Sequence, residues 1–302
     1  MAKLKRQNIY RHSLSIVVEE FISQCKANKL TSDTIKTYQT HIDLFEIALG
    51  EITIEELNET HLQKFNQWLE ENRNYNDVST NTVRRSINVF LKYIHKTYHL
   101  KQLHFDFVKV TKTPRQTFTD DELKRLLHKP DLNNCTYAEY RDWVVTQIIL
   151  STGSTPSSIV NLKKSDLNFH DKTITFTHLK NRKIQTFPIK NDLIKNIKEY
   201  LNVTELHTDF LFENSHDEPL TSKQLSVSFR RYCINRNVQT TSIHALRSVF
   251  AIKLIKSTGD LNLVRLALGH SSPNTTIIYL QNLGINDYSN KLQDFDLIKE
   301  LK

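Results

Sequence analysis

Residues 240–280 read TTSIHALRSVFAIKLIKSTGDLNLVRLALGHSSPNTTIIYL, and the rest of the chain is interpreted outward from this stretch. Its apolar residues recur at helical spacing, while Gly, Ser, Thr, Asp and Pro mark where helices end and begin. These markers set the expected boundaries: a first helix starts after Thr241 or Ser242 and ends at Gly259, a second is capped by Asp260 and runs to Gly269, and a third opens at Ser272-Pro273. The stretch therefore predicts three successive helices.

Four polar side chains stand out within this helical pattern. His244 and Arg247 are three residues apart, so they share one face near the start of their helix. Free N–H groups and the positive end of the helix dipole at that terminus suit a phosphate. His270 follows the second helix directly, and Tyr279 falls in the second turn of the third. Each residue alone also fits an ordinary cap or core position, but the ordered set indicates a functional site.

The order and spacing of these residues resemble the C-terminal signature of the tyrosine recombinase (phage integrase) family, in particular its Xer-like and integrase-like members. That signature is H-x-x-R, then L-G-H, then a tyrosine nine residues later; here it reads His244-Ala-Leu-Arg247, Leu268-Gly-His270 and Tyr279. The resemblance implies a site-specific DNA recombinase or integrase that cuts and rejoins strands through a 3′-phosphotyrosine intermediate, with no metal and no other cofactor. Tyr288 is a rival nucleophile, but it lacks the family spacing from Leu-Gly-His.

Residues 152–162, TGSTPSSIVNL, resemble a second family box, T-G-x-R-x-S-E-[IL]-x-x-L, with two departures. Thr155 stands where the first catalytic arginine belongs, and Ser158 stands where an acidic residue belongs. Threonine has no cationic fork for the phosphate oxygens, and the loss of one such donor commonly slows a reaction on the order of 100- to 1000-fold. Two functions therefore stay open: an active recombinase, or a DNA-binding protein of the same fold with lost or strongly reduced strand cleavage.

A change of period predicts a small antiparallel sheet in the middle of the chain. Residues 173–179 and 184–189 alternate polar and apolar side chains, as paired strands do. Their turn holds Lys180, Arg182 and Lys183. A catalytic lysine of the family sits on such a turn, and the resemblance places it at Lys180, with Lys183 as the alternative.

The resemblance implies a role for each of these side chains at the scissile phosphate. A tyrosine hydroxyl is a weak nucleophile at neutral pH, so it needs a base and neighbouring cations. The resemblance assigns the attack on phosphorus to Tyr279, the grip on the non-bridging oxygens to Arg247, assistance in proton transfer to His244, a hydrogen bond to the phosphate to His270, and protonation of the leaving oxygen to Lys180.

The first hundred residues contain four amphipathic segments and no catalytic constellation. The helical stripes span residues 13–29, 31–49, 52–72 and 79–98. With 5 Gly and 6 Pro in 302 residues, long helices are favoured over a turn-rich β fold. We therefore expect a four-helix bundle here, which in length and helix count resembles the SAM-like core-binding domain of the family.

The expected fold is mainly α with a small antiparallel β-sheet, in which an α+β catalytic domain follows the helical domain. A capping box, Thr119-Asp-Asp-Glu122, marks the start of the second domain. The expected division is residues 1–100 for the DNA-binding domain, 101–118 for a linker, 119–281 for the catalytic domain and 282–302 for a C-terminal tail.

The charge of the chain favours a polyanionic partner. Lys and Arg number 41 against 33 Asp and Glu, which gives a formal net charge of +8. Double-stranded DNA is the expected partner. We expect it to contact cationic or Thr-rich positions in four places: near helix starts, in the linker, on the hairpin turn and on the helix after residue 221. These positions are Lys36, Thr80, Arg84, Arg85, Lys112, Arg115, Arg182, Lys183, Arg230 and Arg231. A solvated face with helix caps is the alternative reading for each.

The remaining features concern location and assembly. Cys25, Cys135 and Cys233 are far apart and lack CxxC or Cys/His ligand spacing, which favours a reduced cytoplasmic protein without a zinc site. No stretch has the length of a membrane span, so we expect a cytoplasmic protein, nucleoid-associated in a bacterium. The tail, residues 282–302, has an apolar stripe that packs on its own domain or on a neighbouring protomer. The resemblance implies a homotetramer on two DNA sites.

Overall fold

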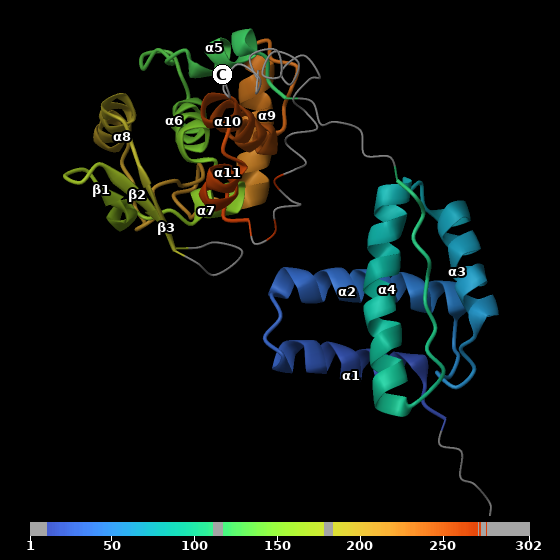
Figure 1. Cartoon of the computed structure of the whole chain (residues 1–302). Helices are drawn as coiled ribbons and strands as arrows, with labels where there is room; N and C mark the ends of the chain where they lie inside the picture. The colour runs from blue at the N-terminus through green and yellow to red at the C-terminus, as the bar shows by residue number, and fades with distance from the viewer. Residues whose placement is uncertain (1–10, 111–116, 178–183, 271, 273–275, 277–302) are drawn as a thin grey trace, which may run out of the picture. The chain divides into compact units, whose positions relative to one another are not determined.

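The computed structural model describes residues 11–110, 117–177, 184–270, 272 and 276 (Figure 1). The chain divides into two compact units, Met1–Lys112 and Thr113–Lys302. Each unit has its own hydrophobic core. Among the described residues, no helix combines the length and the apolar composition that a membrane span needs.

The N-terminal unit contains the four predicted helices. They are α1 (Leu14–Ala27), α2 (Ser32–Leu49), α3 (Glu59–Asn72) and α4 (Asp77–Tyr98). The predicted start of the fourth helix near Ser79 and Thr80 was two residues late. The side chain of Asn76 accepts a hydrogen bond from the Ser79 backbone N–H at 2.9 Å, so Asn76 is the N-cap and the helix begins at Asp77.

The first part of the predicted linker packs on this unit. Leu103 and Phe105 are buried in the N-terminal core. The Asn88 side chain pairs with both backbone groups of Phe105 at 2.8 and 2.9 Å, and Asn81, one heptad earlier on the same face, pairs in the same way with Val108. Residues 101–110 therefore run as an extended segment alongside α4 (Figure 1).

The C-terminal unit combines helices with the predicted sheet. Its elements are α5 (Asp120–Leu127), α6 (Tyr137–Thr152), α7 (Pro156–Val160), the 3-10 turn η1 (Lys164–Asp166), β1 (Leu167–Asn168), β2 (Thr173–Phe176), β3 (Gln185–Pro188), α8 (Asn191–Val203), α9 (Ser222–Asn235), α10 (Ile243–Thr258) and α11 (Leu261–Ala267). The strands form one antiparallel sheet in the order β1-β2-β3, with Ile174 opposite Phe187. The predicted pairing of β2 with β3 is confirmed, whereas the two-residue β1 is too short to show a period in sequence.

Helix α6 forms the centre of this unit. It is buried on all sides, including at Trp143, Val144 and Ile148, and it packs against α5, α8, α9 and α10 (Figure 1). The capping box at Thr119 and Glu122 is present at the start of α5, as predicted. The mainly helical fold with a small antiparallel sheet is confirmed, and α6 is the rigid base for the turns that follow it.

Candidate active site

Arg247 joins two segments that are far apart in sequence. It projects from α10, whose neighbouring residues Ala245 and Leu246 are buried. Its Nη1 donates to the carbonyl oxygen of Gly153 at 2.5 Å, and its Nη2 donates to the carbonyl oxygen of Leu268 at 2.7 Å. One guanidinium therefore holds together the turn after α6 and the end of α11. This contact brings the first-arginine box against the Leu-Gly-His motif.

His270 completes this cluster. Its Nε2 lies 3.1 Å from Nη2 of Arg247, and its Nδ1 lies 2.9 Å from Oγ1 of Thr276. Arginine offers only donors, so Nε2 is the acceptor and Nδ1 carries the proton that it donates to Thr276. Burial first, and then the Arg247 charge, lower the pKa of His270 to about 4. The imidazole is therefore neutral at neutral pH.

Because the pKa of His270 is lowered by folding, we expect the free energy of unfolding to decrease as the pH falls. The folded pKa, about 4, is below the ordinary value of 6.5, so the contribution of His270 is fully present above pH 6.5 and is lost as the pH falls through 4. Urea unfolding between pH 8 and pH 4 measures this effect, and the acid-side loss should be smaller in His270→Gln. A His270 NMR signal that titrates near pH 6.5 would contradict the assignment.

His244 lies one turn before Arg247, at the second residue of α10, and is exposed. It contributes to the wall of a surface pocket of about 400 Å³. The other lining residues come from the segment that leads into α10 and from its first turns: Gln239, Thr240, Thr241, Ser242, Ala245 and Ser248. The pocket lies at the N-terminal end of the helix, where a phosphate is favoured. His244 and Arg247 thus share one end of α10, as the spacing predicts.

Thr155, where the family resemblance predicts an arginine, has a local structural role. It is the N-cap of α7: its Oγ1 accepts from the Ser158 backbone N–H at 3.2 Å, and Pro156 occupies the first turn. Its hydroxyl also lies 2.9 Å from the Ser158 hydroxyl. The two departures from the family pattern therefore contact each other. A neutral hydroxyl pair thus occupies the two positions at which the family resemblance predicts a cation and a carboxylate.

Gly153 allows the close approach on which this turn depends. Its φ is +65°, and a Cβ there would lie 2.4 Å from Cδ1 of Phe250. We expect Gly153→Ala to lower the free energy of unfolding by about 2–4 kcal/mol, from left-handed strain plus overpacking. Gly50 also has a positive φ, +76°, but open space around it. Because its ψ is −161°, a conformation that essentially only glycine adopts, Gly50→Ala should lose about 1–3 kcal/mol from backbone strain alone in the same urea titration. A loss of no more than about 1 kcal/mol in Gly153→Ala, the size expected of left-handed strain alone, would contradict the close contact with Phe250.

Gln185 was not singled out by the sequence. It is the first residue of β3, and its Nε2 donates to the carbonyl oxygen of Leu266 at 2.7 Å. Its side chain also approaches Gly269, where a Cβ would lie 3.0 Å from Oε1. The predicted lysine-bearing hairpin is thus attached to the segment that ends in His270. A lone glutamine in a strand gives no sequence signal for such a contact.

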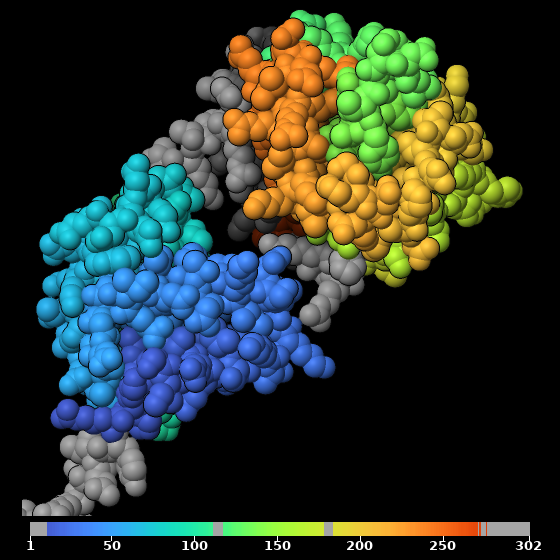
Figure 2. Space-filling model, turned by 180° about the vertical axis from the view of Figure 1, so that it is seen from behind, coloured from blue at the N-terminus to red at the C-terminus, as the bar shows by residue number. Residues whose placement is uncertain are grey.

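The structure places the remaining predicted residues as follows. Lys36, Arg85, Arg230 and Arg231 are exposed, and the last two belong to α9. Helix α9 forms part of the surface of the C-terminal unit (orange, Figure 2). Thr80 is half-buried. Arg84 is also half-buried, because its guanidinium donates to the side chain of Asn66 and to the carbonyl oxygen of Asp106. The predicted residues that lie outside the described part of the chain are Lys112, Arg115, Lys180, Arg182, Lys183, Tyr279 and Tyr288.

Comparisons with known proteins find relatives that match both units of the chain. The model of the phage integrase family matches residues 116–284, and that of the phage integrase SAM-like domain matches residues 13–113. Tyrosine recombinase XerA of Pyrococcus furiosus is 26% identical over 270 residues, which cover 88% of this chain and 89% of the relative. Tyrosine recombinase XerD of Staphylococcus aureus is 24% identical over 282 residues, which cover 88% of this chain and 94% of the relative.

Solved structures share the fold. A lambda integrase (75-356) dimer bound to a COC′ core site has a TM-score of 0.71 at 17% identity, and the match covers 88% of this chain and 95% of that one. The Tn1549 transposon integrase in complex with a circular intermediate DNA has a TM-score of 0.75 at 16% identity, with 92% and 99% covered. A family model that matches more than half of the residues, together with the assembled motif, leads to one conclusion: the chain belongs to the phage integrase family of tyrosine recombinases.

Proposed function

We propose that this protein is a site-specific DNA recombinase or integrase whose nucleophile is Tyr279. The observation that carries the proposal is the position of Arg247, which contacts Gly153 in the first-arginine box and His270 in the Leu-Gly-His motif. The fold of the catalytic unit and its family membership support the same activity. A protein that only binds DNA has no chemical need for this cluster, so the alternative is not favoured.

The proposed reaction is a two-step exchange at phosphorus. The Tyr279 oxygen attacks the scissile phosphate, its proton passes to a base assisted by His244, and the departing 5′-oxygen takes a proton from Lys180. Arg247 stabilises the charge on the non-bridging oxygens, and His270, whose Nε2 accepts from Nη2 of Arg247, positions the guanidinium. A free 5′-hydroxyl from a second duplex then attacks the phosphotyrosine and releases Tyr279. Each step exchanges one P–O bond for another, so neither a nucleotide nor a metal is required.

The proposal includes an assembly on DNA. We assign DNA binding to the helical N-terminal domain, residues 1–100, and catalysis to residues 119–281, with residues 101–118 between them. A net charge of +8 and the exposed cations on α2, α4 and α9 support contact with duplex DNA. Lambda integrase is known as a tetramer bound to a Holliday junction, which supports a homotetramer on two sites here. The tail, residues 282–302, is the proposed docking segment between protomers, and a cytoplasmic location fits a DNA substrate.

A covalent trapping experiment tests the proposed function. Duplexes that the protein selects from a randomised library are rebuilt with a nick beside the candidate cleavage position, so that the short cleaved end diffuses away. We expect a protein–DNA adduct that survives SDS. Salt-dependent binding without any adduct would support the binding-only alternative, and binding that does not weaken with salt would contradict both readings.

Restoring the missing cation is expected to accelerate cleavage. Thr155→Arg places a guanidinium at the first-arginine position, and one additional donor to the transition state should raise the single-turnover rate of adduct formation roughly 10- to 100-fold. Thr155→Ala is the matched control, because it loses the same N-cap, worth about 1 kcal/mol, without adding a charge. Equal rates for Thr155→Arg and Thr155→Ala would show that another cation already occupies this position.

A further inference from the structure

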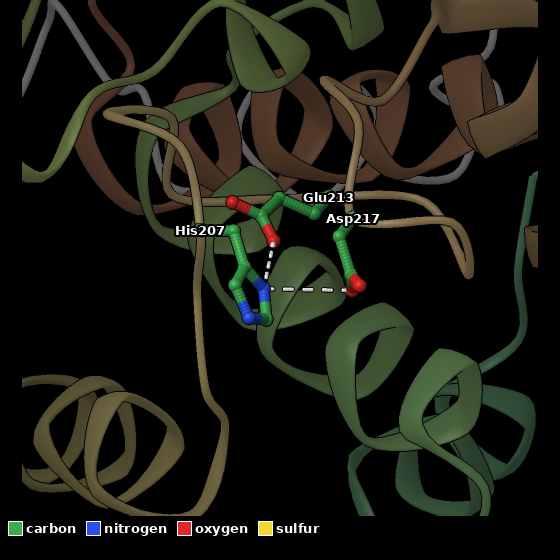
Figure 3. A group of neighbouring side chains, drawn as sticks. All are labelled: His207, Glu213 and Asp217. Carbon is green, nitrogen blue, oxygen red and sulfur yellow. Dashed lines mark ion pairs between the residues drawn. The ribbon is translucent and has the colours of Figure 1, made fainter.

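His207, Glu213 and Asp217 lie together in the segment that connects α8 to α9, and none belongs to the cluster described above. The imidazole of His207 points toward both carboxylates (Figure 3). Its Nδ1 lies 3.9 Å from Oε2 of Glu213 and 3.6 Å from Oδ1 of Asp217. The three ligand atoms all lie within 4.8 Å of one another.

These separations differ from those of ordinary imidazole–carboxylate pairs in the same protein. Nδ1 of His12 lies 2.7 Å from Glu55, and Nδ1 of His170 lies 2.9 Å from Asp171, which are hydrogen-bond distances. The two distances at His207 exceed any hydrogen bond. The His207 ring therefore faces two carboxylates without a hydrogen bond to either.

The spacing does fit three ligands of one metal ion. A point equidistant from three atoms with these separations lies about 2.1–2.4 Å from each of them. Zinc binds imidazole nitrogen and carboxylate oxygen at roughly 2.0–2.2 Å. Shifts of a few tenths of an ångström would therefore complete the coordination.

Glu213 is held in place for this role. Its side chain is 2% exposed, and its Oε1 accepts from the Thr208 backbone N–H at 2.5 Å, while Oε2 faces His207. Its backbone carbonyl accepts from Nη1 of Arg141 at 2.9 Å, on the central helix α6. The Thr208 side chain and the His207 backbone also hydrogen-bond to the Glu213 carboxylate, which fixes its orientation. A ligating carboxylate supported by such outer hydrogen bonds is typical of metal sites.

A tight turn places the Asp217 carboxylate beside His207 and Glu213. Its φ is +58°, and the turn is closed by the bridge between Glu213 and Pro219. The Asn214 side chain accepts from the His216 backbone N–H at 2.7 Å within this turn. The carboxylates of Glu213 and Asp217 therefore both lie beside the His207 imidazole. A divalent cation bound between the three side chains would offset the charge of the two carboxylates.

We propose that His207, Glu213 and Asp217 bind one divalent transition-metal ion of the zinc type, completed by water, which fixes the connection between α8 and α9. An imidazole ligand favours this class over magnesium or calcium, which take oxygen ligands. The role is structural and independent of the chemistry at Tyr279. The expectation that no metal is bound rested on the family resemblance and on the cysteine spacing, and the spacing His-x5-Glu-x3-Asp carries no comparable signal.

Calorimetric titration of the metal-free, full-length protein with Zn²⁺ tests the proposal. We expect one ion per chain, and Co²⁺ at the same site should show visible d–d absorption bands. His207→Gln and Asp217→Asn should each weaken Zn²⁺ affinity at least roughly tenfold, because each removes one ligand. Both side chains are at least half exposed, so their unfolding midpoints in EDTA should equal that of the wild type.

His170→Gln is the matched control, because it removes an exposed histidine that hydrogen-bonds to a neighbouring carboxylate. Its Zn²⁺ affinity and stoichiometry should equal those of the wild type. The absence of saturable binding would overturn the proposal. Binding that persists unchanged in both His207→Gln and Asp217→Asn, or that weakens equally in His170→Gln, would overturn it as well.

Discussion

Arg247→Lys is expected to slow formation of the covalent DNA adduct roughly 100- to 1000-fold at saturating DNA. Lysine keeps the charge but loses the planar fork. One ammonium cannot replace the two guanidinium nitrogens that donate to the carbonyl oxygens of Gly153 and Leu268 and leave the remaining N–H groups of the fork for the phosphate in the proposed mechanism. Because Thr155 supplies no cation, we expect Arg247 to carry more of the electrostatic stabilisation than it would in a site with two arginines.

The measurement is the single-turnover rate of adduct formation on a nicked substrate, with DNA affinity determined in the same buffer. Arg230→Lys and Arg231→Lys are the matched controls, because both arginines are exposed on α9 and retain their charge after substitution. Their rates at saturating DNA should equal the wild-type rate. A rate change of less than about tenfold in Arg247→Lys would contradict the proposed contact with the transition state.

Much of the fold was predictable because its signals are local. The caps at Thr31 and Thr119 depend on hydrogen bonds within three residues, and the Gly259 and Asp260 boundary depends on two adjacent residues. Helical and alternating periods then identify the long helices and the β2–β3 pair. None of these signals requires knowledge of the tertiary structure.

Features that depend on distant contacts were not predictable in the same way. Asn81 and Asn88 look like ordinary polar helix residues, yet they bind the backbone of residues 101–110 and fix a segment expected to be a linker. Gln185 contacts Leu266, 81 positions away. Periodicity within one element contains no information on such partners.

In the candidate site, too, local features were predictable and distant contacts were not. Helical spacing alone places His244 beside Arg247. The contacts of Arg247 with Gly153 and Leu268 bridge 94 and 21 residues, and before the structure only the family resemblance related these segments. The role of Thr155 as the N-cap of α7 was also hidden, because the family pattern directs attention to the missing arginine.

Tyr279→Phe is expected to abolish the covalent adduct, because phenylalanine keeps the ring but has no oxygen to attack phosphorus. DNA binding should be unchanged, since the substitution removes one hydroxyl and no charge. Tyr288→Phe is the control, and it should form the adduct at the wild-type rate, because Tyr288 lacks the family spacing from Leu268-Gly-His270.

The most direct test of the account is to identify the residue linked to DNA. The trapped adduct is digested with nuclease and trypsin, and mass spectrometry locates the tyrosine that carries the residual nucleotide. We predict that the modification lies on Tyr279 in the wild type and is absent from the Tyr279→Phe variant. A nucleotide on Tyr288, or an adduct that persists in Tyr279→Phe, would contradict the account.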